Sequence, residues 1–240
     1  MWFAPNVTKM KERGDIAGLV KALRYKEWSI RETAAHALGD LRAKAAVEAL
    51  GNLVQAEKNP YVGLTFAKAL TKIGDEEGLP YVVDLALFAD IDKVRMSAGQ
   101  LLPEFGASAL LFLTDALWID DLPIARRAAE TLVFFGAGAV PALAAVLEGK
   151  VFAPASTMES NIRAMQTRRR VAGLGFNPTI LVAMGMLTAT NGRIDAAADA
   201  LRRINDIGGH EALRTAANSE SEPVRLAANK ALGIAQNRDA

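Results

Sequence analysis

The sequence contains no cysteine and only two histidines among its 240 residues. The lack of cysteine excludes disulfides, thiolate nucleophiles and cysteine-ligated metal sites. Neither sign of charge dominates, because 28 Lys and Arg balance 27 Asp and Glu to a net charge of +1. A dedicated duplex-binding protein usually carries a clear basic excess, so this balance argues against that class. A chain without cysteine is compatible with a reducing cytoplasm, which is the compartment that we expect.

Long uninterrupted apolar runs are scarce as well. Residues 1–14 contain no run long enough for a secretory signal. Residues 171–190 are uncharged and reach the length of a membrane span. However, Asn177 and Pro178 interrupt this segment, together with the glycines at 173 and 175. We therefore expect a buried helix there, and no membrane partner.

A short amphipathic pattern recurs along the chain. Its first copy begins at Ile30 and places apolar or small residues four, eight and eleven positions later, which keeps one face of a helix inward. Further copies begin at Val62, Val94, Ile124 and Val224. The first four starting positions are separated by 32, 32 and 30 residues. A period of this length is typical of one repeat of a helical solenoid. Glycine follows the last apolar residue in three copies, where it can end a helix.

The pattern predicts an all-α fold, a right-handed α-α superhelix of about seven helix pairs with an irregular fifth repeat. We expect one repeat domain over residues 1–240, with an N-terminal cap at 1–14, regular repeats 1–4 at 15–136, an irregular repeat at 137–176 and repeats 6–7 at 177–236. The predicted pairs are 15–24 with 29–41, 43–56 with 61–73, 76–89 with 93–105, 108–118 with 123–135, 139–148 with 158–172, 178–190 with 193–207, and 210–218 with 223–235.

The register of the helix predicted at 193–207 has two solutions. A start at Arg193 directs Ala197, Leu201 and Ile204 inward, whereas a start at Ala196 directs Ala200, Ile204 and Ile207 inward. The first lies 31 residues before Val224, close to the period of the array, and is the one that we favour.

These helix pairs resemble HEAT repeats, in particular the short kind grouped with phycobilin-lyase-like HEAT repeats. The matching segments are 28–40, 94–98 and 223–233, together with the opening segment 14–23. The resemblance implies that an arginine directly after the starting position meets acidic groups between repeats. Arg31, Arg95 and Arg225 hold this position. We interpret them as structural, and surface ion pairs of this kind contribute only about 0–1 kcal/mol each.

Ordinary catalytic and metal-binding sets are missing from the sequence. His210-Glu211 begins like a zinc-binding His-Glu-x-x-His motif, but Arg214 stands where the second histidine should be. The HEAT-repeat enzyme deoxyhypusine hydroxylase binds iron through several His-Glu pairs, and this chain has one. Bilin lyases share the repeats, but no motif here singles them out. We therefore predict no catalytic residue, no metal and no cofactor, and lean against an enzyme.

One cluster of positive charge falls in the irregular middle of the chain. It consists of Arg163, Arg168, Arg169 and Arg170, and no acidic residue lies between Asn161 and Asn191. Insertions in solenoids often lie on the binding face. The cluster is either a solvated helix face or a contact for a small anionic ligand.

The outward positions of the second helices, two, six and ten residues after each start, predict the binding surface. They carry both signs of charge together with Leu64, Met96 and Phe134, which suits a protein or peptide partner better than a phosphate backbone. The residues that we predict to contact the partner are Glu32, His36, Lys68, Lys72, Gln100, Arg126 and Glu130.

The leading hypothesis is thus a non-catalytic scaffold that binds a protein or peptide on its second helices. The first alternative is a lyase or chaperone-like protein that acts on a tetrapyrrole or another anionic ligand. The second is nucleic-acid binding in the concave groove, which the mixed charge makes unlikely.

Overall fold

The computed structural model describes residues 4–118, 121–148 and 188–233, which are helical and contain no β-strand. The chain divides into two compact units, residues 1–109 and 110–240, and each is described by itself. The all-α class predicted from the period is confirmed. The right-handed sense, the count of seven pairs and the single-domain organisation stay predictions.

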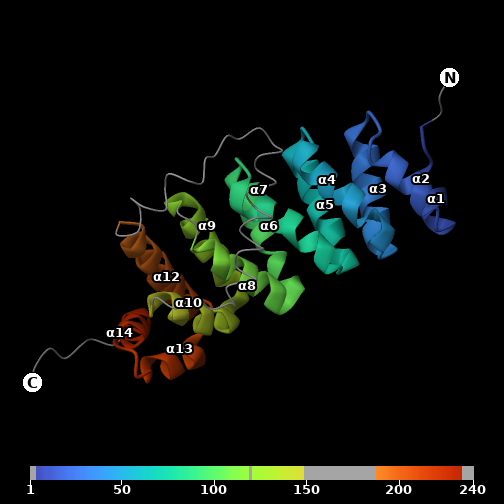
Figure 1. Cartoon of the computed structure of the whole chain (residues 1–240). Coiled ribbons are helices and arrows are strands. Elements are labelled where there is room, and N and C mark those ends of the chain that lie inside the picture. Colours follow the sequence, from blue (N-terminus) through green and yellow to red (C-terminus); the bar gives the residue numbers. More distant parts are fainter. Residues whose placement is uncertain (1–3, 119–120, 149–187, 234–240) are drawn as a thin grey trace, which may run out of the picture. The chain divides into compact units, whose positions relative to one another are not determined.

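Unit 1 begins with a short capping helix and continues as three stacked helix pairs (Figure 1). The cap is α1 (Val7–Glu12), and the pairs are α2 (Ile16–Ala22) with α3 (Trp28–Asp40), α4 (Val47–Ala56) with α5 (Pro60–Ile73), and α6 (Leu79–Phe88) with α7 (Asp92–Gly99). Single 3₁₀ turns precede α4 and α6, η1 (Lys44–Ala46) and η2 (Glu76–Gly78), and η3 (Leu102–Phe105) follows α7.

Local sequence explains where these helices begin and end. The side chains of Asn6 and Asp15 accept hydrogen bonds from the first turns of α1 and α2. Pro60 opens α5, where its missing N–H costs no hydrogen bond, and Gly74 ends that helix with φ 72°. Pro103 lies in η3, which ends the α-helical part of the third pair at Gly99.

Unit 2 contains most of α8 (Gly106–Ala116), followed by α9 (Leu122–Leu132), η4 (Val133–Ala139) and α10 (Val140–Leu147). After residues 149–187, which lie outside the described part of the chain, come α12 (Thr188–Asp206), α13 (His210–Ala217) and α14 (Glu222–Ala231). The helices predicted at 158–172 and, for the most part, at 178–190 fall in the segment outside the described residues.

Helix α12 lies between two other second helices of unit 2. It packs on α9, on α14 and on α10 (Figure 1). Helix α10 is the first helix of a repeat. Among the described first helices, it is the one that packs most extensively on α12. The sequence pattern predicts a sixth pair of residues 193–207 with residues 178–190, and most of this predicted partner lies outside the described residues. The structure adds that α12 packs on α9, the second helix of the fourth pair.

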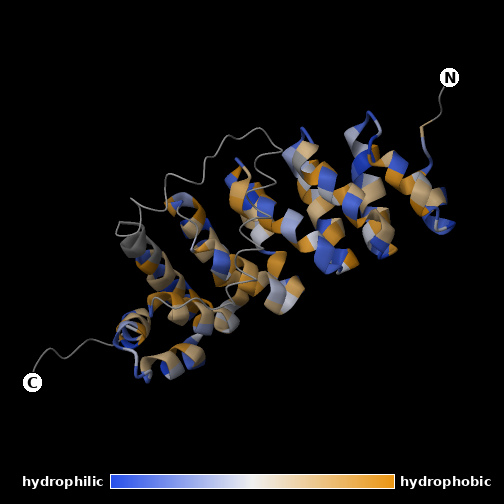
Figure 2. Ribbon diagram, viewed as in Figure 1, coloured by the Kyte–Doolittle hydropathy of each residue, from blue (hydrophilic) through white to orange (hydrophobic). Residues whose placement is uncertain are grey.

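The core of each unit follows the repeating pattern. The positions that start each copy, and those four and eight residues later, are buried in the copies that begin at Val62, Val94 and Ile124. In α12 the inward residues of both registers are buried, those from Arg193 (Ala197, Leu201 and Ile204) and also Ala196 and Ala200. Ile207, which only the register from Ala196 directs inward, is 59% exposed, and this favours the register from Arg193. Polar and apolar residues alternate around the helices accordingly (Figure 2).

One described stretch, Leu122–Leu147, is long and apolar enough to cross a membrane by length and composition alone. It runs through α9, η4 and α10, and Gly136 breaks it with φ 54° and ψ −134°. Half of its most apolar window is buried inside the protein, as expected for core helices of a helical array.

Candidate functional site

In unit 1 the second helices α3, α5 and α7 carry the predicted contact residues. His36, Lys68 and Gln100 are exposed, so their side chains are free to meet a partner. Glu32 is half-buried and accepts a hydrogen bond from Thr65 Oγ1 at 3.2 Å, which joins α3 to α5. Glu32 therefore also has a role inside the fold. Leu64, predicted to point outward, is instead buried, because α5 lies between α3 and α7.

The carboxylate of Asp40 joins three helices at the end of this surface. Lys11 Nζ of α1 donates to Asp40 Oδ2 at 2.5 Å, and Lys72 Nζ of α5 donates to Asp40 Oδ1. The hydrogen bond from Lys11, followed by that from Lys72, lowers the pKa of Asp40 to about 2. Lys72, one of the predicted contact residues, is thus already paired within the fold.

We expect Asp40→Asn to reduce the stability of unit 1 at neutral pH, and the difference from wild type to vanish in acid. The folded pKa is lowered, so the stabilisation is present above the unfolded pKa of about 4 and is lost as the pH falls toward the folded value. Because the Asp40 side chain is 34% exposed, solvent limits the effect to about 1 kcal/mol or less. Urea melts between pH 7 and pH 2 measure it, and a difference that persists at the acid end would contradict this ion-pair account.

The arginines directly after the starting positions have a common contact. In each case Nη1 donates to the backbone carbonyl six residues earlier, in the turn that leads into the second helix. Arg31 reaches the oxygen of Tyr25 at 3.0 Å, Arg95 that of Ala89 at 3.4 Å, and Arg225 that of Ser219 at 3.1 Å. The interpretation of these arginines as structural agrees with this geometry.

Arg31 also forms a two-pronged ion pair with Glu57 of the following turn. Nε donates to Oε2 at 2.6 Å and Nη2 to Oε1 at 2.7 Å. The side chains are only 16% and 6% exposed, so the expectation of a weak surface pair is wrong for Arg31. Burial opposes ionisation of Glu57, but hydrogen bonds from Arg31 and from the Asn59 N–H outweigh it, and the pKa of Glu57 lies below its usual value.

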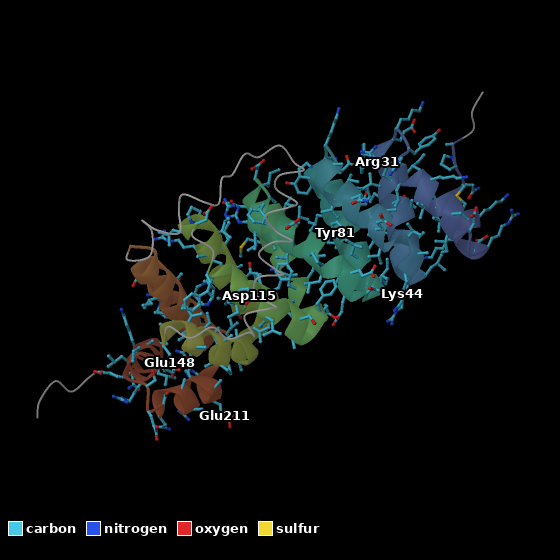
Figure 3. All side chains as sticks on the ribbon, in the orientation of Figure 1. Arg31, Lys44, Tyr81, Asp115, Glu148 and Glu211 are labelled. Carbon is cyan, nitrogen blue, oxygen red and sulfur yellow. The ribbon has the colours of Figure 1, made fainter. Side chains whose placement is uncertain are left out.

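The second repeat has no counterpart of this arginine, because Gly63 occupies the position. A Cβ atom at Gly63 would lie 3.1 Å from the carbonyl oxygen of Val54, so even a small side chain would crowd the preceding helix. Figure 3 shows Arg31 near the edge of unit 1 where the chain turns into α3. The glycine at this position of the second repeat therefore has a steric reason.

Unit 2 contains a groove of about 450 Å³ across its three second helices α9, α12 and α14. Every uncharged lining residue is an alanine, whose small side chain leaves room between the helices, and the other lining residues are charged. The lining residues are Arg126, Ala129, Glu130, Asp195, Ala196, Ala198, Asp199, Ala200, Arg202, Arg203, Ala227, Lys230 and Ala231.

Most charges of the groove have no ion-pair partner in the described part of the chain. Arg202 pairs with Asp199 within α12. The other charged lining residues, Arg126, Glu130, Asp195, Arg203 and Lys230, form no ion pair with described residues. A groove that combines alanines with guanidinium, ammonium and carboxylate groups can form charge-assisted hydrogen bonds to a polar polypeptide.

Two of the seven predicted contact residues, Arg126 and Glu130, line this groove. The sequence prediction missed Asp195, Asp199, Arg203 and Lys230, although they occupy the same outward positions in the register from Arg193 and from Val224. Applying the outward rule to these two helices would have found them.

The remaining sequence candidates do not assemble into a chemical site. Arg163, Arg168, Arg169 and Arg170 lie outside the described residues. His210 and Glu211 are exposed at the beginning of α13, and Figure 3 labels Glu211. Within the described residues, no three His, Asp or Glu side chains gather where they could hold a metal ion.

Comparison with known proteins identifies the repeat. The family model of HEAT repeats matches residues 16–103. No curated protein matches the chain. Similar solved structures include human deoxyhypusine hydroxylase, with 18% identity over 95% of this chain and 88% of that one at a TM-score of 0.38. They also include the CpcE–CpcF complex of phycocyanin lyase from Nostoc sp., with 24% identity over 94% and 89% at a TM-score of 0.37.

A designed armadillo repeat protein is similar as well, with 17% identity over 91% of this chain and 99% of that one at a TM-score of 0.34. Likenesses of this extent do not bear on function. The family match covers the stacked pairs of unit 1, from the start of α2 to η3. The recognition of HEAT repeats from the sequence is thereby confirmed, and residues 16–103 of this chain are HEAT repeats.

Proposed function

We propose that the chain is a non-catalytic HEAT-repeat scaffold that binds a protein or peptide on the surface formed by its second helices. The observation that carries the proposal is the groove across α9, α12 and α14, which is lined by alanines and by charges of both signs that have no ion-pair partner among the described residues. A binding surface for a polypeptide typically combines an apolar centre with a polar rim. In unit 1, taken by itself, His36, Lys68 and Gln100 are likewise exposed on or at the end of second helices.

The charge pattern favours this function over nucleic-acid binding. Three cations of the groove, Arg126, Arg203 and Lys230, have no ion-pair partner among the described residues, but neither do the carboxylates Glu130 and Asp195. A surface that follows a phosphate backbone needs cations without interspersed carboxylates. The alternative of a tetrapyrrole or other anionic ligand rests on the arginines at 163 and 168–170 and stays a prediction.

Affinity capture from the source cell tests the proposal. Arg126→Glu/Lys230→Glu reverses two charges of the groove and should reduce recovery of the partner by about tenfold or more, as for charged groups at a binding site. The matched control is Lys21→Glu/Arg214→Glu, which makes the same change of net charge at exposed positions of the first helices α2 and α13. Full recovery with the groove variant, or equal loss with both variants, would contradict the assignment.

A third bait, Arg168→Glu/Arg169→Glu, separates the alternatives. We expect it to retain the partner. Loss of capture with this bait alone would transfer the binding site to the arginine cluster and favour an anionic ligand.

A further inference from the structure

In unit 1 the first repeat shows how two positions of a second helix join the repeat that follows. The position directly after the start of α3 is Arg31, whose Nε and Nη2 donate to the Glu57 carboxylate at 2.6 and 2.7 Å. The next position is Glu32, which accepts a hydrogen bond from Thr65 of α5 at 3.2 Å. Both positions therefore face the following repeat.

In unit 2, Arg225 and Leu226 occupy these two positions of α14, and we call the two residues the end flank. Helix α14 packs on α12, α13 and α10, and it is the last helix of the described residues (Figure 1). Within the described part of the chain, no repeat follows α14 to cover the end flank.

The apolar half of the end flank has a matched counterpart in unit 1. Leu64 holds the same position in α5 and is 7% exposed, because α5 packs between α3 and α7. Leu226 is 39% exposed in α14, for which α12 is the only neighbouring second helix among the described residues. The residue type and the position are the same, so the exposure follows from the neighbours. A helix that packs beside α14 would bury Leu226 favourably.

The charged half of the end flank is a guanidinium with donors to spare. Nη1 of Arg225 donates to the carbonyl oxygen of Ser219 at 3.1 Å, as Nη1 of Arg31 does to that of Tyr25. Nε and Nη2 of Arg225 form no hydrogen bond with described residues, whereas those of Arg31 hold Glu57. This edge of a guanidinium binds a carboxylate through two parallel hydrogen bonds.

The acidic residues next to Arg225 do not occupy this edge. Glu220 and Glu222 are exposed, and neither forms an ion pair with described residues. Glu222 lies three residues before Arg225, as Asp92 lies before Arg95. Asp92 pairs with Arg95 through Nη1 at 2.7 Å, and the buried Nε of Arg95 has no hydrogen-bond partner. In the array, the Nε edge is thus filled by a carboxylate of the following repeat and not by one of the same helix.

We propose that the end flank docks a helix pair of a partner protein, whose leading turn presents a carboxylate to Arg225 and whose second helix covers Leu226. The occupant continues the stacking of the first two repeats, with its carboxylate in the place that Glu57 has beside α3. The groove uses other positions of α14, those on its side toward α12 and α9. This proposal therefore does not depend on the groove.

A second copy of this chain does not match the end flank. Glu57 lies five residues before the start at Val62, and the residue five before the start at Ile30 is Tyr25, which has no carboxylate. In addition, α1 packs on α2 and α3 and covers the first pair of unit 1. The occupant is therefore another polypeptide with a glutamate or aspartate in its leading turn.

An extended form of the full chain tests the proposal, with the second repeat of unit 1 as the probe. A copy of residues 44–73 replaces residues 238–240, which sets the copied Glu57 26 residues after Arg225, the separation between Arg31 and Glu57. The covalent link gives the probe a high effective concentration. We expect hydrogen exchange at residues 224–233 to be about tenfold slower or more than in the unextended chain, because docking opposes local opening of α14.

Two variants of the copied segment provide the control. Glu57→Gln in the copy should lose most of the added protection, because the amide cannot accept both hydrogen bonds of the guanidinium as a carboxylate does. Glu48→Gln in the copy removes a carboxylate that is exposed on the first helix, and it should keep the protection. Exchange in unit 1, which contains the original segment, should be the same in all of these chains.

Three outcomes would overturn the proposal. Unchanged exchange of α14 in the extended chain would show that the end flank does not accept a helix pair. Full protection with Glu57→Gln in the copy would show that Arg225 does not select a carboxylate. A dimer of the unextended chain in sedimentation equilibrium, dissociated by Leu226→Ser, would assign the end flank to a second copy of this chain.

Discussion

Leu70→Asp is expected to unfold unit 1. Leu70 is fully buried in α5, which packs against α3, α4 and α7. The substitution removes a core leucine, which costs about 2–5 kcal/mol, and places an unpaired carboxylate in an apolar environment, which costs several more. A domain of this size is stable by only about 5–15 kcal/mol. Circular dichroism and hydrogen exchange should show the loss of helical structure and of amide protection over residues 16–103.

Lys68→Asp is the matched control, because it introduces the same side chain two residues away at an exposed position of α5. Its effect on the free energy of unfolding should be within about 0.5 kcal/mol. A thermal melt of Leu70→Asp that equals that of wild type would show that the inward face of α5 is assigned wrongly. Equal destabilisation by both variants would mean that α5 tolerates no aspartate at all, independent of burial.

Arg31→Met is expected to destabilise unit 1 by about 3–5 kcal/mol, the usual cost of breaking a buried ion pair from one side. The variant leaves the Glu57 carboxylate only 6% exposed without its guanidinium partner. It also removes the donor to the carbonyl oxygens of Tyr25 and Lys26, each at 3.0 Å. Replacing both partners, in Arg31→Met/Glu57→Leu, should restore part of this loss, since no charge is then left buried.

The destabilisation by Arg31→Met should depend on pH. The pKa of Glu57 is lowered in the folded wild type, so its ionised form stabilises the fold above the unfolded pKa of about 4.3. This stabilisation is lost as the pH falls toward the folded pKa. Urea melts should therefore show the largest difference at neutral pH and a smaller one below about pH 4.

The control for this pair is Arg95→Met. Arg95 holds the equivalent position, but its carboxylate partner Asp92 is 82% exposed and its contact to Ala89 is longer, at 3.4 Å. We expect a loss of about 1 kcal/mol, because no charge is left buried. If Arg95→Met cost as much as Arg31→Met, the burial of Glu57 would not be the reason for the effect.

The sequence period predicted the inward face of the helices because stacking in a solenoid imposes the same burial on every repeat. The period did not predict burial correctly at the ends of the second helices, where the α-helical geometry changes. The pattern places the position eleven residues after each start inward, but Leu41 is 36% exposed, and Phe105 and Phe135 are only half-buried. Leu41 is the C-cap of α3, and the two phenylalanines lie in 3₁₀ segments, whose period of about three residues rotates them away.

The outward face was harder to predict than the inward face. Burial of Leu64 comes from the lateral packing of α5 between two neighbours, which a helix-by-helix pattern does not contain. Arg126 and Glu130 were predicted as contact residues, and they line the groove. Asp199 and Lys230 hold outward positions of their own helices, so the rule could have found them, but their approach to α9 depends on which helix follows it in space. Residues 149–187 separate α10 from α12, so the sequence order conceals that neighbour.

Hydrogen exchange of the chain bound to its captured partner tests the central claim most directly, because it reports which helices the partner covers. Binding on the second helices of unit 2 predicts slower exchange at residues 126–130, 195–203 and 227–231, with unchanged exchange in the first helices α10 and α13. Slower exchange confined to α10 and α13, with none in the three segments of the groove, would contradict it.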